Sequence, residues 1–168
     1  MPGAIELKDP RETFEIGLSL GRAIDEMIKT PFTVTIQGEL GAGKTTLCRG
    51  LAAALGADPK EVVSPTFTLA NVYLADRPIN HLDLYRLGDD ACREFIEAGL
   101  EECFDSLCLV EWPERIDRDF YPDERLDLIF NYQSFGRTLR AFRTTLAAQN
   151  MWSYVKAQSD QVKRKWLE

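Results

Sequence analysis

Residues 38 to 45 constrain the fold of this chain more than any other part of its sequence. They read GELGAGKT, a full match to the pattern G-x-x-x-x-G-K-[ST]. Residues 32–37 before them alternate apolar side chains with threonines, as a strand does, and residues 44–55 after them read as a helix closed by Gly56. A strand, a glycine-rich turn and a helix in this order predict a phosphate-binding loop. We therefore expect an α/β fold, a three-layer P-loop NTPase domain with a largely parallel central sheet.

The residue types of this loop suit the binding of a nucleoside triphosphate. Gly38, Gly41 and Gly43 permit backbone angles at which successive N–H groups face one anion, and the following helix adds its positive dipole end. Lys44 can extend to the β- and γ-phosphates, and the Thr45 hydroxyl can join the coordination shell of Mg²⁺. The predicted nucleotide-binding residues of the loop are Gly38, Glu39, Leu40, Gly41, Ala42, Gly43, Lys44, Thr45 and Thr46.

Two carboxylates are placed to complete such a site. Asp83 lies in the expected strand 79–84, and Glu111 directly follows the apolar run 107–110. Ligands of open α/β sheets bind where the parallel strands end, so we expect both strands to lie beside the strand that carries the loop. The predicted catalytic residues are Lys44, Asp83 and Glu111, and the predicted Mg²⁺ ligands are Thr45, Asp83 and Glu111. Which carboxylate contacts the metal directly stays open.

A turn-prone segment, residues 64–68 (SPTFT), lies between the loop and Asp83. Two interpretations stay open: a nucleotide switch that closes on the γ-phosphate, or an ordinary Ser-Pro turn leading into a strand at 69–74. His81 lies two residues before Asp83 on the same strand face, and we interpret it as structural. The sequence lacks an Asn-Lys-x-Asp element for guanine, so we expect ATP.

Composition excludes several classes of protein. With 20 Lys and Arg against 27 Asp and Glu in 168 residues, the net charge of −7 disfavours direct binding of nucleic acid. One histidine excludes a zinc site built on a histidine pair. The four cysteines include no Cys-x-x-Cys pair, and we interpret all four as reduced core residues. Because no run of apolar residues resembles a signal peptide or a membrane span, we expect a cytoplasmic protein with one domain across residues 1–168.

Hydrophobic periodicity predicts the remaining elements. Asp9 and Glu12 form a capping box for a helix over residues 10–29. Asp89 is expected to cap a helix toward residue 102, which Gly99 can break. Further strands are expected at 126–132 and 138–142, and an amphipathic C-terminal helix from about 148, with Trp152 and Trp166 at helical spacing and a basic end, Lys163, Arg164 and Lys165.

Four segments together resemble the bacterial TsaE (YjeE) family. They are residues 38–46, residues 64–68, residues 81–87 (HLDLYRL) and residues 111–114 (EWPE), and their order and spacing match as well as their letters. The resemblance covers about residues 13–140 and leaves the C-terminal helix as a family-variable segment. It implies a P-loop ATPase required for threonylcarbamoyladenosine modification of tRNA. It also implies docking on a complex of TsaB and TsaD, which ATP turnover drives or resets, with tRNA met only indirectly.

The resemblance also implies roles for single residues. It assigns Lys44 and Thr45 to the phosphates and Mg²⁺, Glu111 to the metal or the attacking water, and Asp83 to a second essential acid. Residues 64–67, including Thr66, would form a mobile switch. It places Trp112 near the nucleotide pocket and Arg137 near the nucleotide.

Two other functions stay open at this point. A small-molecule kinase shares the phosphate-binding loop but needs an acceptor pocket and an arginine-bearing lid, for which Arg115 and Arg118 are the available residues. A non-catalytic, nucleotide-dependent binding module needs the loop alone. The sequence assigns no arginine finger, since Arg86, Arg137 or a partner's residue could each serve, so we expect slow turnover in isolation.

Overall fold

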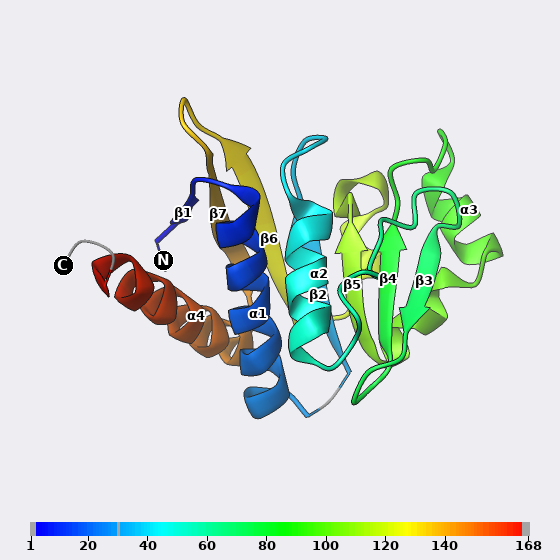
Figure 1. Ribbon diagram of the computed structural model, residues 1–168. Coiled ribbons are helices and arrows are strands. Elements are labelled where there is room, and N and C mark those ends of the chain that lie inside the picture. The colour runs from blue at the N-terminus through cyan, green and yellow to red at the C-terminus, as the bar shows by residue number, and fades with distance from the viewer. Residues whose placement is uncertain (1–2, 30, 166–168) are drawn as a thin grey trace.

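A computed structural model describes residues 3–29 and 31–165, and this part of the chain builds one seven-stranded sheet with helices on it (Figure 1). The strands are β1 (Ile5–Leu7), β2 (Phe32–Gln37), β3 (Ala70–Tyr73), β4 (Ile79–Asp83), β5 (Leu107–Glu111), β6 (Arg125–Tyr132) and β7 (Arg137–Thr144). The helices are α1 (Pro10–Met27), α2 (Lys44–Ala54), α3 (Ala91–Glu97) and α4 (Leu146–Lys165), with 3₁₀ helices η1 (Leu100–Asp105), η2 (Pro113–Arg115) and η3 (Arg118–Phe120).

The sheet has the strand order β1-β7-β6-β2-β5-β4-β3. Its central strands β6, β2, β5 and β4 are parallel, whereas β1, β7 and β3 join antiparallel at the two sides. The predicted α/β class with a largely parallel centre is confirmed. One detail was wrong: β5 lies beside β2, but β4 lies one strand further out, paired with β5. Asp83 and Glu111 are nevertheless direct partners in the register, so both carboxylates leave the sheet at the same edge.

Hydrophobic side chains cover the sheet on both faces. Helices α1, α2 and α4 lie on the face toward the viewer in Figure 1, over a core that includes Phe32, Leu47 and Trp152. A second cluster, with Phe95 and Phe104 at its centre, packs α3 and η1 against the other face around β4 and β5. Successive side chains of a strand point to opposite faces of the sheet, so each central strand sends side chains into the packing on both sides. The loop-bearing strand is therefore buried on both faces.

The cysteines divide between burial and partial burial. Cys48 and Cys108 are fully buried, as predicted, whereas Cys92 and Cys103 are partly buried at the edge of the second cluster. All four are free thiols. Among the described residues, no helix combines the length and the apolar character that crossing a membrane requires.

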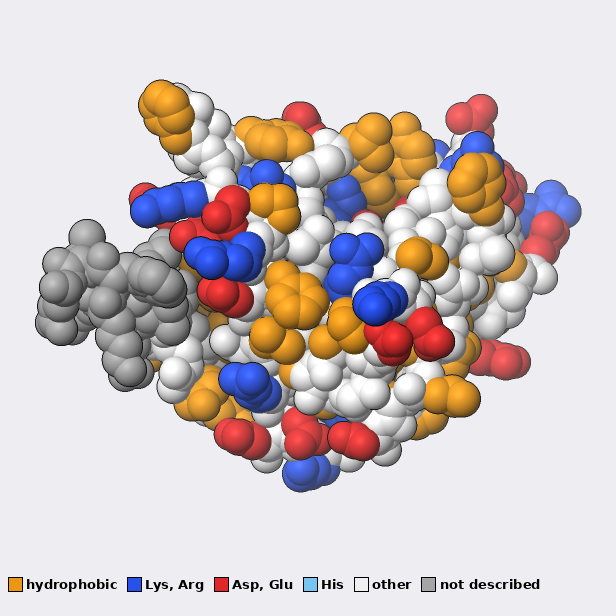
Figure 2. All heavy atoms as spheres, viewed as in Figure 1, with side chains coloured by type: hydrophobic (Ala, Val, Ile, Leu, Met, Phe, Trp, Pro, Cys, Tyr) orange, Lys and Arg blue, Asp and Glu red, His pale blue; other side chains and the backbone are white. Residues whose placement is uncertain are grey.

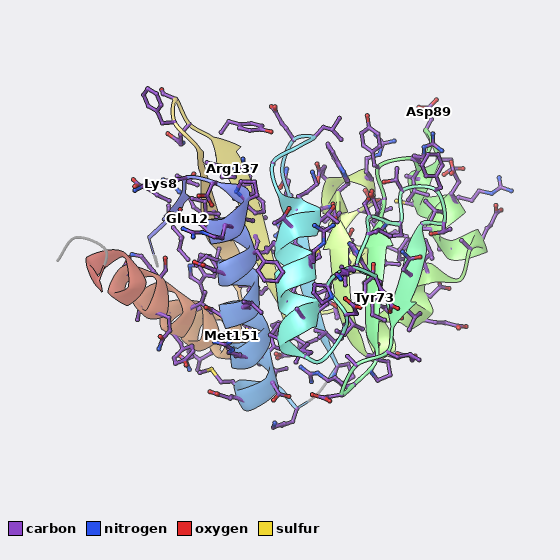
Figure 3. All side chains as sticks on the ribbon, viewed as in Figure 1. Lys8, Glu12, Tyr73, Asp89, Arg137 and Met151 are labelled. Atoms are coloured by element: carbon purple, nitrogen blue, oxygen red, sulfur yellow. The ribbon has the colours of Figure 1, made fainter. Side chains whose placement is uncertain are left out.

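Helix boundaries follow the sequence signals in most places. The Asp9 carboxylate accepts the Glu12 N–H at 2.8 Å, so the predicted N-cap of α1 is confirmed. The reciprocal bond of the capping box was placed one residue too late, because the Glu12 carboxylate accepts the N–H of Lys8, at 2.7 Å, and not that of Asp9 (Figure 3). The Asp89 cap was wrong: α3 follows Asp90, whose side chain makes no capping bond. Gly99 takes a left-handed conformation and separates α3 from η1, which confirms the predicted break.

Two further differences concern the ends of the chain. Strand β1 was not predicted, because three residues at a sheet edge carry too short a pattern to detect. The C-terminal helix α4 begins at Leu146, close to the expected start. Trp166 and the side chains of Lys163, Arg164 and Lys165 lie outside the described residues.

Helices α1 and α2 approach each other closely at glycines. A Cβ on Gly50 would lie 2.2 Å from the Phe14 carbonyl oxygen, and one on Gly17 would lie 2.4 Å from the Leu47 carbonyl oxygen. Only a residue without a side chain fits where two helix backbones are this close. Since α2 begins at Lys44, this contact holds the phosphate-binding loop against the rest of the fold.

Replacing Gly50 with alanine is expected to lower the free energy of unfolding by about 1–3 kcal/mol, because two helix backbones have to move apart. Urea unfolding followed by circular dichroism measures the change. Gly88→Ala is the matched control, since its Cβ would meet only the end of the flexible Glu94 side chain. A Gly50→Ala midpoint equal to wild type would contradict the close packing.

Candidate nucleotide-binding site

The loop between β2 and α2 has the backbone that anion binding needs. Gly38, Gly41 and Gly43 have φ angles of 153°, 76° and 109°, all in the region that favours glycine. At Gly38 a Cβ would also lie 2.9 Å from the Phe130 Cβ. Gly43 precedes the first turn of α2, where helix N–H groups lack intrahelical partners. The loop therefore offers free donors beside the positive end of a helix.

Lys44 lies folded into the loop. Its Nζ donates to the carbonyl oxygens of Gly38 at 2.7 Å and Glu39 at 2.9 Å, and it lies 4.0 Å from the centre of the Trp112 ring. Trp112 has a φ of 60°, rare for a bulky residue, directly after Glu111. Burial lowers the pKa of the Lys44 ammonium, while the charges of Glu111, Glu114 and Asp83 oppose that shift. A buried cation is thus held against the loop by two carbonyl oxygens, which a phosphate can replace.

Glu111 connects the start of α2 with the interior of the sheet. Its Oε1 accepts the Thr45 hydroxyl at 2.8 Å and lies 2.9 Å from His81 Nε2. His81 Nδ1 lies 2.9 Å from the Tyr73 hydroxyl, which donates to the Val63 carbonyl at 2.9 Å. His81 and Glu111 are both buried. The single histidine therefore positions a carboxylate, a role that sequence analysis described only as structural.

Asp83 binds the segment 64–68. Its Oδ2 accepts the hydroxyl groups of Ser64 and of Thr66, the latter at 2.7 Å, and its Oδ1 accepts the Tyr85 N–H at 3.0 Å. Phe67, 83% exposed, lies under the Arg86 guanidinium. The segment thus reaches the site through side-chain hydroxyls, which a simple turn before a strand would not require.

These side chains line one cavity of about 370 Å³. Its lining residues are Leu40, Gly41, Gly43, Lys44, Thr45, Thr46, Ser64, Thr66, Asp83, Tyr85, Glu111 and Trp112. Most of the predicted site residues therefore meet. Tyr85 was missed although it lies in the HLDLYRL segment; its ring centre lies 4.8 Å from that of Trp112.

Arg137 lies behind the loop instead of in the cavity (Figure 3). Its Nη1 donates to the Ala42 carbonyl at 2.7 Å and to the Gly41 carbonyl at 3.3 Å. Tyr132 acts similarly, since its hydroxyl donates to the Leu40 carbonyl at 2.9 Å. Both side chains come from the β6–β7 hairpin and hold loop carbonyls, which leaves the loop N–H groups for a ligand. Gly38, Glu39 and Ala42 contribute backbone to the loop but do not line the cavity.

The donor set fits a magnesium nucleotide. The Thr45 hydroxyl and the carboxylates of Glu111 and Asp83 are oxygen ligands, which Mg²⁺ prefers, and they line the same cavity as Lys44. Phosphate groups would meet the ammonium and the helix end.

Comparison with known protein families gives one match over most of the chain. The profile of the family described as "Threonylcarbamoyl adenosine biosynthesis protein TsaE" matches residues 7–139. The chain belongs to the TsaE family. The match runs from β1 into β7, so it includes every residue that lines the cavity and leaves α4 outside. The resemblance identified from the four segments is therefore confirmed.

Individual TsaE proteins match over most of this chain. The "tRNA threonylcarbamoyladenosine biosynthesis protein TsaE" of Nostoc sp. is 35% identical over 139 residues, 79% of this chain and 80% of the relative. That of Aquifex aeolicus is 36% identical over 134 residues, 79% of this chain and 90% of the relative. Among solved structures, the crystal structure of Bacillus subtilis YdiB superposes with a TM-score of 0.68 at 25% identity, covering 93% of this chain and 95% of that one.

Proposed function

We propose that this protein is a Mg²⁺-dependent ATPase that acts in tRNA threonylcarbamoyladenosine biosynthesis, where ATP hydrolysis drives or resets a complex of TsaB and TsaD. One observation carries the enzymatic part: the buried Glu111 carboxylate lies on the Thr45 hydroxyl, in the cavity that also holds Lys44. A buried acid at this point can orient water as well as hold Mg²⁺, which favours hydrolysis over binding alone. Membership of the TsaE family supports the assignment to this biosynthetic pathway.

The residues divide the chemistry as follows. Loop N–H groups and Lys44 bind the phosphates, after Lys44 Nζ leaves the Gly38 and Glu39 carbonyls. Mg²⁺, when bound at Thr45 and the carboxylates, supplies positive charge against the phosphate oxygens. Glu111 accepts a hydrogen bond from the attacking water and orients it in line with the bond that breaks between the γ-phosphorus and the β,γ-bridging oxygen. ADP and inorganic phosphate leave.

Asp83 couples this site to the segment 64–68. Two hydroxyls of that segment, those of Ser64 and Thr66, are bound to Asp83 Oδ2. A γ-phosphate and Mg²⁺ compete for the same hydroxyls and carboxylate, so the segment is expected to rearrange with the nucleotide state. Exposed Phe67 would move with it and change the surface that a partner meets.

The surface around the cavity supports a protein partner. Leu40, Phe67 and Tyr85 are exposed at its rim, and Figure 2 shows hydrophobic side chains along this upper edge of the molecule. The net charge of −7 favours contact with the modifying enzymes over direct contact with tRNA. We expect TsaB and TsaD to be these partners.

Phosphate release with and without TsaB and TsaD tests the proposal. Slow turnover in isolation and a faster rate with both partners are expected, since no arginine among the described side chains lines the cavity to stabilise the transferred charge. A rate that is maximal alone and indifferent to the partners would contradict it. A phosphorylated metabolite in a substrate screen would indicate the small-molecule kinase. ATP loss equal in wild type and Glu111→Gln, with partners present, would indicate a binding module.

A further inference from the structure

Three side chains with metal-binding atoms meet directly beneath the nucleotide cavity. Cys48 comes from α2, His81 from β4 and Glu111 from β5, and one ligand atom from each lies within 4.8 Å of the other two. All three residues are buried. A thiol, an imidazole and a carboxylate at this spacing form the kind of three-residue set that binds Zn²⁺ with a fourth position left open.

The fold brings these residues together for separate reasons. Cys48 follows Thr45 by three residues, so it lies one helical turn below the hydroxyl that contacts Glu111. His81 and Glu111 lie on adjacent parallel strands near their C-terminal ends. Glu111 lines the cavity, so a cation that enters there meets the carboxylate first. The sequence assigned Cys48 to the core, which is correct, but its sulfur faces polar groups.

A second observation concerns the orientation of His81. The Tyr73 hydroxyl has one proton and donates it to the Val63 carbonyl, so its oxygen accepts a hydrogen bond from His81 Nδ1. Nε2 is on the opposite side of the ring and lies 2.9 Å from Glu111 Oε1, so the proton of that hydrogen bond is the one that a cation between the two atoms displaces. Metal-binding histidines are commonly fixed in this way, with one nitrogen donating to a neighbour while the other faces the ion.

We propose that Cys48, His81 and Glu111 bind one thiophilic divalent cation of the Zn²⁺ type, separate from the nucleotide's Mg²⁺. Sulfur and nitrogen ligands favour Zn²⁺ and Co²⁺ and disfavour Mg²⁺. The cation replaces the proton of the Cys48 thiol and the proton between His81 Nε2 and Glu111. Both protons pass to solvent, and the cation takes a lone pair from each ligand. Because Glu111 belongs to both sites, the two cations compete, and Zn²⁺ inhibits the ATPase. This inhibition rests on the proposed function, whereas the binding does not.

Binding a cation at Cys48 requires the loss of a thiol proton in a buried place, which costs free energy. Burial raises the pKa of the Cys48 thiol well above its ordinary value, and the charges of Glu111 and Asp83 act in the same direction. The selectivity itself follows from the ligand atoms, because the sulfur of Cys48 and the nitrogen of His81 suit Zn²⁺ and Co²⁺, whereas Mg²⁺ prefers oxygen.

Cobalt titration of the full chain, free of nucleotide and Mg²⁺ and reduced with a phosphine, tests the binding. Co²⁺ is expected to produce near-ultraviolet thiolate-to-cobalt absorption and the visible bands of a four-coordinate site, saturating at one equivalent. Zn²⁺ should remove both signals. Wild-type protein without thiolate-to-cobalt absorption would overturn the proposal, whatever its ATPase activity.

Paired variants identify the ligands. Cys48→Ser should lose the thiolate-to-cobalt absorption, whereas Cys108→Ser should keep it, because Cys108 is equally buried but packs in the cluster on the other face of the sheet. Persistence of the absorption in Cys48→Ser would overturn the assignment. Thermal unfolding verifies that each variant folds, and Glu111→Gln, which preserves the side-chain shape, is the second ligand variant. It should weaken Co²⁺ binding at least about tenfold.

The competition is measured on the ATPase. Zn²⁺ at about ten times its dissociation constant should raise the Mg²⁺ concentration for half-maximal activity about tenfold in wild type. Cys48→Ser, compared with its own zinc-free rate, should show no such shift. Cobalt binding without any ATPase activity would refute the proposed function and leave the cation site standing. An active enzyme whose Mg²⁺ dependence ignores Zn²⁺ would overturn the competition.

Discussion

Glu111→Gln is expected to lower kcat about 10²- to 10³-fold, measured with TsaB and TsaD present, while the dissociation constant for ATP changes by no more than about threefold. Glutamine has nearly the shape of glutamate but no charge, so the variant tests the charge of the Glu111 side chain alone. The Thr45 hydroxyl bonds to Oε1, which the amide retains, and that oxygen can still accept from His81. The protein should therefore fold normally, and its melting temperature should stay within a few degrees of wild type. What disappears is the negative charge beside Thr45.

The expected separation of binding from turnover follows from where the charges lie. Lys44, the loop N–H groups and the start of α2 are unchanged in the variant, and these carry phosphate binding. Phosphate release and calorimetric titration measure the two quantities separately. Glu101→Gln, the same substitution at an exposed acid of η1, should leave both at wild-type values. Full turnover in Glu111→Gln would show that Asp83, or a group of the partner, orients the water.

The site could be predicted best from the sequence where the residues that act together lie within one motif. The loop, its glycine conformations and the meeting of Lys44 with Thr45 are local, because a strand, a turn and a helix fix them within a few residues. Glu111 could be predicted because it directly follows a buried apolar strand, and ligands of a parallel sheet bind at the C-terminal ends of its strands. The burial of β2 and β5 followed from the same apolar patterns.

Contacts that depend on strand order could not be predicted. His81 meets Glu111 because β4 pairs with β5, 30 residues later in the chain, and hydrophobic periodicity carries no information on such pairing. Arg137 supports the loop because β7 lies next to β6, which pairs with β2. The resemblance indicated that Arg137 lies near the nucleotide, but not that it supports the loop from outside the cavity.

Close helix packing was missed for a different reason. Gly17 and Gly21, four residues apart on α1, carry a signal that sequence analysis did not use. Residues four apart share a helix face, so two glycines at that spacing indicate a neighbour at backbone distance. Gly17 meets Leu47 and Gly50, and Gly21 meets Leu51 and Ala54, all on the helix that begins at the nucleotide site.

Lys44→Met is expected to weaken ATP binding about 100-fold, a loss of about 2.7 kcal/mol, while the melting temperature changes little. Methionine matches the length of the lysine stem and fills the same space under Trp112. The protein loses two hydrogen bonds to the Gly38 and Glu39 carbonyls, which costs stability. It also loses a buried ammonium, and removing that desolvation penalty has the opposite sign.

Binding has no such compensation. The triphosphate brings negative charge to a cavity in which Glu111 and Asp83 already lie, and among the described residues Lys44 is the cation that lines it. Calorimetric titration with ATP and Mg²⁺ measures the loss, and Lys60→Met, at an exposed lysine outside the cavity, is the matched control. If Lys44→Met binds ATP within about threefold of wild type, backbone N–H groups and the helix end hold the phosphates unaided. The lysine would then act only on the transition state, and its loss would appear in kcat alone.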